Sequence, residues 1–143
     1  MPSSASPFMV HVGRILRSGE SRHERVVGPI PDLFVTGSEV PPGAGITVDV
    51  ELEPVGHTIE AVGTVSAPWT GLCRRCLQPV SGEVVAEVRE IFEDKPVEEE
   101  TYPLLHDQID LELMAREAVV LELPPAPLCK EDCRGLCAQC GAD

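Results

Sequence analysis

The sequence predicts an α+β fold: an antiparallel β-sheet that can curl toward a barrel, with one main helix and a cysteine-rich zinc-binding region. Three observations carry this prediction. Apolar and polar residues alternate in several stretches, as in strands with one buried face. One later stretch has helical periodicity instead, and all six cysteines fall in two short segments. At 143 residues, the chain is most simply a single domain covering residues 1–143.

The N-terminal third predicts short elements. Residues 1–7 are a polar stretch that we expect to be a flexible tail. Phe8–Val12 alternates and predicts a strand. Arg14–Gly19 follows as a helical turn ended by glycine. Glu24–Ile30 is a second strand, which Pro29 restricts to a sheet edge or a strand end.

The middle of the chain gives the strongest strand signal. Ile46–Glu53 and Thr58–Val65 both alternate, and the turn residues Pro54–His57 join them. This arrangement predicts an antiparallel hairpin. Pro68 is expected to end its second strand.

A further strand is expected to run to about Phe92, with Val84, Ala86 and Val88 on its apolar face. Glu90 interrupts that face, which indicates partial exposure or a bulge. Residues 93–108 are then expected to form an acidic, mobile loop. Its glutamates are candidates for binding a basic partner: Glu98, Glu99 and Glu100.

Asp110 begins the main predicted helix, because its carboxylate can cap free backbone amides. The apolar stripe on this helix consists of Leu111, Met114, Ala115, Ala118 and Val119. Pro124 and Pro125 end the helix. A stiff linker then leads into the cysteine-rich C-terminal segment, residues 128–143.

The chain is acidic, with 24 Asp and Glu against 11 Lys and Arg and a formal net charge of −13. Such a body repels bulk nucleic acid, so the charge favours either solubility or a basic partner. Residues 1–7 lack the features of a secretory signal, and no apolar run is long enough for a membrane span. We therefore expect a cytoplasmic protein without membrane contact.

The cysteines predict one structural zinc ion per chain. The candidate ligands are Cys73, Cys76, Cys129, Cys133, Cys137 and Cys140. Two Cys-x-x-Cys pairs separated by a long insertion have the spacing of a zinc ribbon. A local site built from the last four cysteines, or a mixed set that includes Cys73 and Cys76, also fits the spacing. Disulfides or thiol-redox chemistry are the alternatives.

Catalytic signatures are absent from the sequence. It contains no glycine-rich phosphate loop, no nucleophile elbow and no His-Glu-x-x-His. The sequence therefore favours a binding protein without a small-molecule substrate. The alternatives are a zinc-containing RNA-processing enzyme and a thiol-redox protein.

Several motifs in their order along the chain resemble the YceD family, the large ribosomal RNA subunit accumulation protein. These motifs are Cys73-Arg-Arg-Cys-Leu-Gln-Pro79, Ile109-Asp-Leu111, Glu117–Pro124 and the cysteine-rich Cys129–Gly141. The resemblance implies a non-catalytic ribosome-assembly factor that supports accumulation of large-subunit (23S) ribosomal RNA. The implied partners are the preribosomal large subunit, ribosomal RNA or a basic ribosomal protein. Arg74 and Arg75 are then the best candidates for phosphate contacts.

Overall fold

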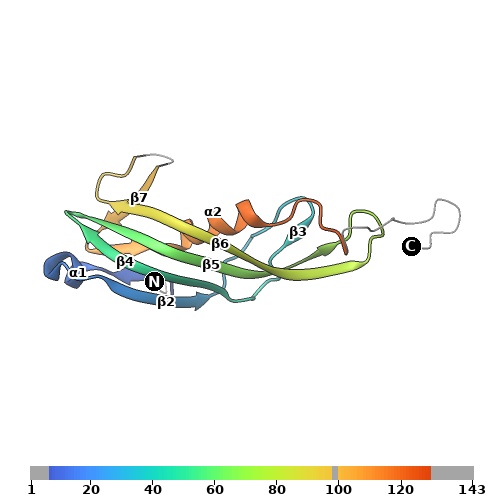
Figure 1. Cartoon of the computed structure of the whole chain (residues 1–143), viewed down its shortest axis with the longest axis horizontal. Coiled ribbons are helices and arrows are strands. Elements are labelled where there is room, and N and C mark those ends of the chain that lie inside the picture. Colours follow the sequence, from blue (N-terminus) through green and yellow to red (C-terminus); the bar gives the residue numbers. More distant parts are fainter. Residues whose placement is uncertain (1–6, 98–99, 130–143) are drawn as a thin grey trace, which may run out of the picture.

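The computed structural model describes residues 7–97 and 100–129. The protein is mostly sheet, curled like half a barrel, with few helices (Figure 1). The elements in chain order are β1 (Met9–His11), α1 (Gly13–Ser18), β2 (Arg22–Gly28), β3 (Ser38–Glu39), β4 (Ile46–Val55), β5 (Thr58–Leu72), β6 (Pro79–Glu93), β7 (Thr101–Leu105), β8 (Gln108–Asp110) and α2 (Leu111–Glu122).

The sheet order is β1-β8-β7-β6-β5-β4-β2, and the short β3 pairs with β5. All these pairs are antiparallel except β6 and β7, which run parallel. The predicted antiparallel sheet is therefore wrong at this pair. The two strands overlap only at residues 91–93 and 101–103, so a short loop can return the chain. Residues 101–105, expected to be part of an acidic loop, form β7.

The predicted central hairpin is confirmed and is longer than expected. Val55 pairs with Thr58, so the turn is only Gly56 and His57, and Gly56 supplies a φ of 63°. The prediction that Pro68 ends the strand is wrong, because β5 continues to Leu72. Along β5, pairing with β4 extends through Ser66 and pairing with β3 begins at Thr70. Pro68 thus lies in a gap where that edge has no partner strand among the described residues, and such positions tolerate proline.

Strand β6 contains no bulge at Glu90. Its register with β5 is unbroken from Phe92, opposite Ile59, to Pro79, opposite Leu72. Glu90 is instead half-buried on the face that it shares with Val88. The partial-exposure alternative is the one that the strand adopts.

The predictions of strands and a helical turn between residues 8 and 30 are also confirmed, whereas residues 1–6 of the expected flexible tail lie outside the described residues. Phe8, Val10 and Val12 are buried, and Gly19 ends α1 in the left-handed conformation. β2 is an edge strand, as Pro29 predicted. The Arg22 guanidinium donates a hydrogen bond of 2.7 Å to the His11 carbonyl, so a residue of β2 reaches the opposite edge of the curled sheet.

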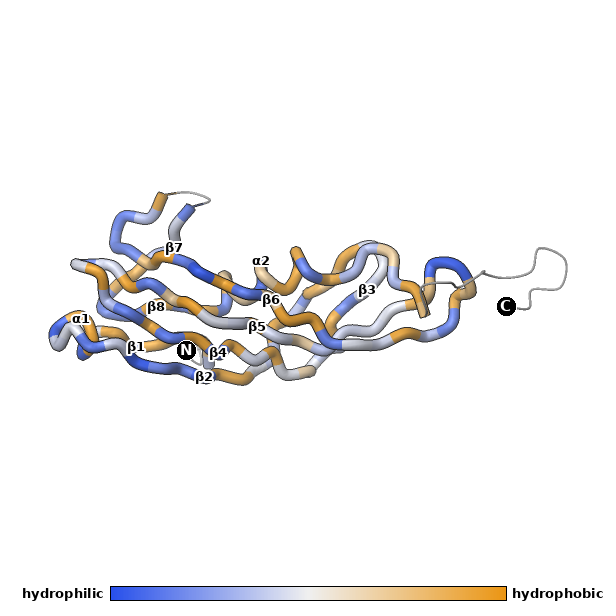
Figure 2. Tube along the Cα trace, viewed as in Figure 1, coloured by the Kyte–Doolittle hydropathy of each residue, from blue (hydrophilic) through white to orange (hydrophobic). Residues whose placement is uncertain are grey.

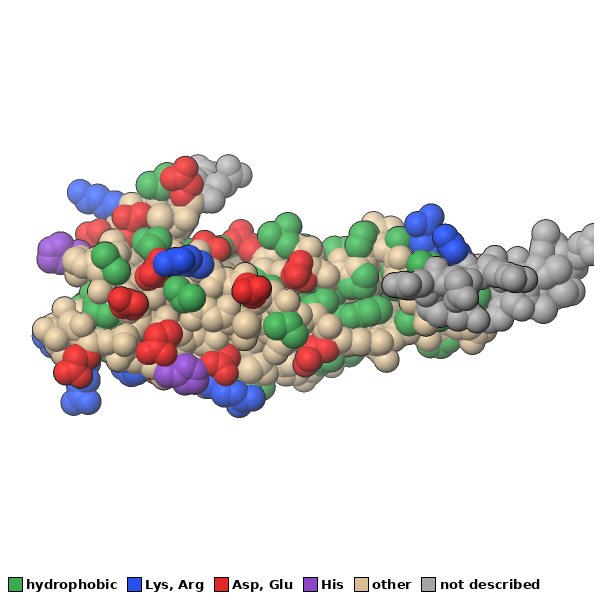
Figure 3. Space-filling view, viewed as in Figure 1, with side chains coloured by type: hydrophobic (Ala, Val, Ile, Leu, Met, Phe, Trp, Pro, Cys, Tyr) green, Lys and Arg blue, Asp and Glu red, His purple; other side chains and the backbone are tan. Residues whose placement is uncertain are grey.

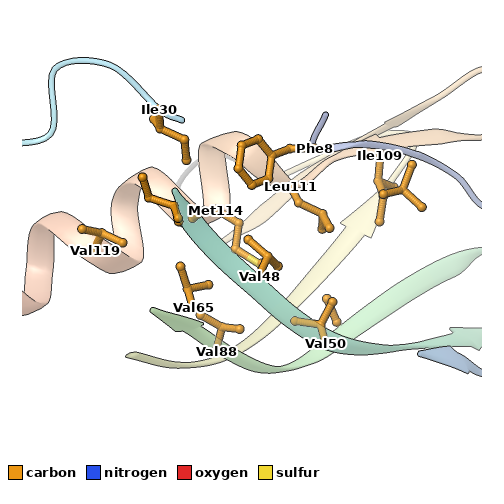
Figure 4. Packing of buried hydrophobic residues seen from close by; sticks show 14 of the residues in the cluster. Phe8, Ile30, Val48, Val50, Val65, Val88, Ile109, Leu111, Met114 and Val119 are labelled. Atoms are coloured by element: carbon orange, nitrogen blue, oxygen red, sulfur yellow. The ribbon is translucent and has the colours of Figure 1, made fainter. Parts of the chain in front are cut away.

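Helix α2 closes the core over the inner face of the sheet. The Asp110 carboxylate accepts a hydrogen bond of 2.9 Å from the Glu112 amide, which confirms the predicted cap. Figure 4 shows Leu111, Met114 and Val119 of α2 facing valines of the central strands. Each such buried side chain contributes about 1.5–3 kcal/mol of transfer free energy. Figure 2 shows the matching alternation of hydropathy along the strands.

Candidate metal centre

The tip of the β5–β6 hairpin carries the first cysteine pair. The Cys73 amide donates to the Gln78 carbonyl at 2.8 Å, and the Leu77 amide donates to the Cys73 carbonyl at 2.9 Å. These bonds fold residues 73–78 into a tight turn. Leu77 has a φ of 63°, a conformation that costs a residue with a side chain roughly 1–2 kcal/mol. The turn therefore holds a strained backbone directly after the Cys-x-x-Cys pair.

The linker that follows α2 is docked against this tip. The Ser38 hydroxyl donates to the Pro124 carbonyl at 2.7 Å, and the Arg74 amide donates to the Pro127 carbonyl at 2.8 Å. The second bond joins the cysteine turn directly to the linker. As a result, Cys129 arrives beside Cys73 and Cys76.

Two glycines allow this close approach. A Cβ at Gly37 would lie 2.2 Å from the Pro125 carbonyl oxygen, and one at Gly71 would lie 2.5 Å from the Gly37 carbonyl oxygen. Sequence reasoning missed Gly37, Ser38 and Gly71, because they act through backbone contacts between segments far apart in the chain. No residue spacing signals such a contact.

The three described cysteines form one cluster. The Sγ atoms of Cys73, Cys76 and Cys129 all lie within 4.8 Å of one another, and those of Cys76 and Cys129 are 3.5 Å apart. Sulfurs around a tetrahedral zinc ion are about 3.8 Å apart, whereas a disulfide requires about 2.05 Å. The donor set is chemically suitable too, because thiolates are preferred zinc ligands. The three cysteines can therefore hold a metal ion.

Burial of the cluster is uneven. Cys73 and Cys76 are fully buried, with Val80 and Leu128 packed against them, while Cys129 is exposed. An apolar surround of this kind limits water access to a metal site. The remaining predicted ligands, Cys133, Cys137 and Cys140, lie outside the described residues.

The candidate interface residues stand at opposite ends of the molecule. Arg74 and Arg75 are exposed on the cysteine turn, whereas Glu100 is exposed where β7 begins, beyond the other end of β6. A strand of fifteen residues spans about 50 Å. One small partner therefore cannot contact both groups. Glu98 and Glu99 lie outside the described residues.

The acidic outer face of the sheet is partly neutralised within the chain. Asp49 pairs with His23 and lies 3.9 Å from Arg25, and Glu60 lies 3.1 Å from Arg89. Figure 3 shows acidic side chains spread over the part of the molecule away from the cysteine tip, with basic side chains among them and at both ends.

The fold and the cluster together define a class: a mostly-β protein with a cluster of three cysteines that could hold a metal ion. The family model described as "Large ribosomal RNA subunit accumulation protein YceD" matches residues 61–143. The chain belongs to the YceD family, as its motifs predicted. The family is named for an accumulation factor and not for an enzyme.

Curated relatives align with the chain over a longer span. Uncharacterized proteins of Mycobacterium bovis and Mycobacterium tuberculosis are 35% identical over 147 residues, covering 96% of this chain and 70% of theirs. A protein of Mycobacterium leprae, also uncharacterized, is 36% identical over 122 residues, which cover 78% of this chain and 56% of that protein. No solved structure matches the chain. Neither helix in the described residues has the length and apolar character needed to cross a membrane.

Proposed function

We propose that this protein is a non-catalytic, cytoplasmic assembly factor that supports accumulation of large-subunit (23S) ribosomal RNA. The membership in the YceD family is the observation that carries this proposal. In the proposed role the protein binds a preribosomal particle, through ribosomal RNA, a basic ribosomal protein or both. The net charge of −13 favours protein contacts over most of the surface.

One structural zinc ion per chain would stabilise the cysteine end. Cys73, Cys76 and Cys129 would supply three thiolates, and one of Cys133, Cys137 and Cys140 the fourth. The ion would tie the linker to the hairpin tip, so its binding free energy would add to folding. Arg74 and Arg75 flank this site and are the proposed phosphate contacts.

The test of the assembly role is the ratio of large-subunit to small-subunit ribosomal RNA after deletion of the gene in its host. The expected result is a lowered ratio that the wild-type protein restores and Cys76→Ser does not. An unchanged ratio, in cells where the deletion is verified, would contradict the role.

The phosphate contacts are tested separately by cosedimentation with large-subunit precursors on sucrose gradients. Arg74→Gln/Arg75→Gln is expected to reduce cosedimentation. Arg14→Gln/Arg17→Gln is the matched control, because these exposed arginines stand on α1, far from the cysteine turn. An equal loss of cosedimentation in both variants would mean that only the overall charge matters. It would contradict a specific role for Arg74 and Arg75 in phosphate contacts.

A further inference from the structure

Strand β6 has an open edge beside α2. On the side away from β5, β7 covers only Ile91–Glu93. Over residues 79–90, no other strand of the described chain pairs with that side. An unpaired edge presents backbone N–H and C=O groups that can accept another strand.

This edge borders a groove of about 1350 Å³ between β6 and α2. Its apolar lining is unusually accessible: Val85 is 52% exposed, Leu113 46% and Leu121 83%. Alternating side chains of an added strand would contact these residues. The groove thus offers both backbone pairing and apolar contacts to an extended segment.

The charge of the groove is one-sided. Its acidic lining residues are Glu87, Glu90, Glu100, Glu117 and Glu122, against the single basic residue Arg116. Arg116 is already engaged, because it donates to the Pro31 carbonyl at 2.8 Å and lies 3.7 Å from Glu112. The glutamates of the groove therefore outnumber the basic groups available to neutralise them.

Glu90 and Glu117 are two of these glutamates, and their charges repel each other. Burial, and after it the charge of Glu117, raises the pKa of Glu90. The Glu117 carboxylate also accepts a hydrogen bond from the Tyr102 hydroxyl. A cation placed between the two carboxylates would relieve their repulsion, whereas a nucleic-acid phosphate would increase it.

We propose that the groove binds an extended, basic polypeptide segment, which adds to the β6 edge as a strand and places Lys or Arg side chains against Glu90 and Glu117. The inference rests on the proposed assembly role and specifies its protein partner: a lysine- and arginine-rich segment with alternating apolar residues. Pairing along Val85–Glu90 would engage about 20 Å of the segment. The groove is distinct from the cysteine turn, where phosphate contacts are proposed.

The experiment measures binding of a fluorescent ten-residue peptide of alternating lysine and valine by anisotropy. The expected result is saturable binding that weakens about tenfold in Glu90→Gln/Glu117→Gln, as loss of charged hydrogen bonds predicts. Glutamine at 117 can still accept the Tyr102 hydrogen bond. The matched control is Glu51→Gln/Glu53→Gln, which removes the same charge from exposed positions on β4 and should bind as wild type.

A second peptide tests the strand pairing. The same sequence with alternate backbone amides N-methylated keeps its charge and loses half its donors, so it is expected to bind at least about tenfold more weakly. Equal binding of both peptides, equal weakening by both double variants, or no saturable binding would overturn the proposal. Cosedimentation of Glu90→Gln/Glu117→Gln with large-subunit precursors distinguishes the proposed peptide groove from the proposed assembly role. Retained cosedimentation together with failed peptide binding would overturn the groove and leave the assembly role standing.

Discussion

The Sγ atoms of Cys76 and Cys129 lie 3.5 Å apart, although 53 positions separate these residues in the sequence. The contact joins the tip of the β5–β6 hairpin to the linker that follows α2. Any metal bound there would therefore crosslink the two halves of the chain.

Replacing Cys76 by serine is expected to reduce zinc content from one ion per chain to well below one. The reason is that a buried thiolate at the centre of the cluster is lost. Elemental mass spectrometry of purified protein measures this directly. Single serine variants at Cys133, Cys137 and Cys140 would identify the fourth ligand. Full zinc content in Cys76→Ser would mean that the C-terminal cysteines form a site of their own.

Gly37→Ala is expected to displace the linker, because its Cβ would lie 2.2 Å from the Pro125 carbonyl oxygen. Overpacking of this kind costs about 1–3 kcal/mol. Zinc affinity, measured by competition with a chromophoric chelator, should fall with the free energy of unfolding. Gly43→Ala is the control: its left-handed φ of 82° makes alanine strained, yet no atom lies within 4 Å and the linker is untouched. Unchanged zinc affinity in Gly37→Ala would show that linker docking does not position Cys129.

Met114→Ala is expected to destabilise the fold by about 2–5 kcal/mol, because this side chain is buried between α2 and the sheet. Urea denaturation followed by circular dichroism gives the change. Leu113→Ala, on the exposed side of the same helix turn, should stay within about 0.5 kcal/mol of wild type. A similar loss of unfolding free energy in both variants would contradict the burial of Met114 between α2 and the sheet.

Glu90→Gln is expected to stabilise the protein at neutral pH. Burial and the charge of Glu117 raise the pKa of Glu90, so the folded chain holds this proton more tightly than the unfolded chain. The free energy of unfolding of the wild type therefore falls as pH rises from the ordinary carboxyl pKa through the raised one. Urea titrations between about pH 4 and pH 8 should show a smaller fall in Glu90→Gln. The exposed Glu51→Gln serves as control, and parallel curves for wild type and Glu90→Gln would refute the expectation.

Local patterns predicted most of the elements but not their neighbours. The β4–β5 hairpin was readable because one face is buried and the other exposed, which leaves a period of two in the sequence. The Asp110 cap was readable for a similarly local reason. β7 was missed because Tyr102 and Pro103 break any period, and its parallel pairing with β6 has no local signal. Pro68 led to a wrong prediction of the end of β5, because proline ends a strand only where a neighbouring strand needs its backbone N–H.

The candidate site divides in the same way. Residue types and spacing were enough to propose all six cysteines as candidate ligands, because metal chemistry restricts both, but they did not single out Cys73, Cys76 and Cys129. The groove at Glu90 was not predicted, since it arises from the edge of one strand and the side of a helix that are brought together only by the fold.

The pairing of β1 with β8 has a consequence for how the protein emerges from the ribosome. Met9–His11 pairs with Gln108–Asp110, so the first strand to be translated finds no partner until more than two thirds of the described chain has been made. Cys73 and Cys76 likewise leave the exit tunnel well before Cys129. Until then the β4–β5–β6 meander, held by neighbouring contacts, is the part that can form. Closure of the sheet edge therefore waits for residues 108–110, and closure of the cysteine cluster waits for Cys129.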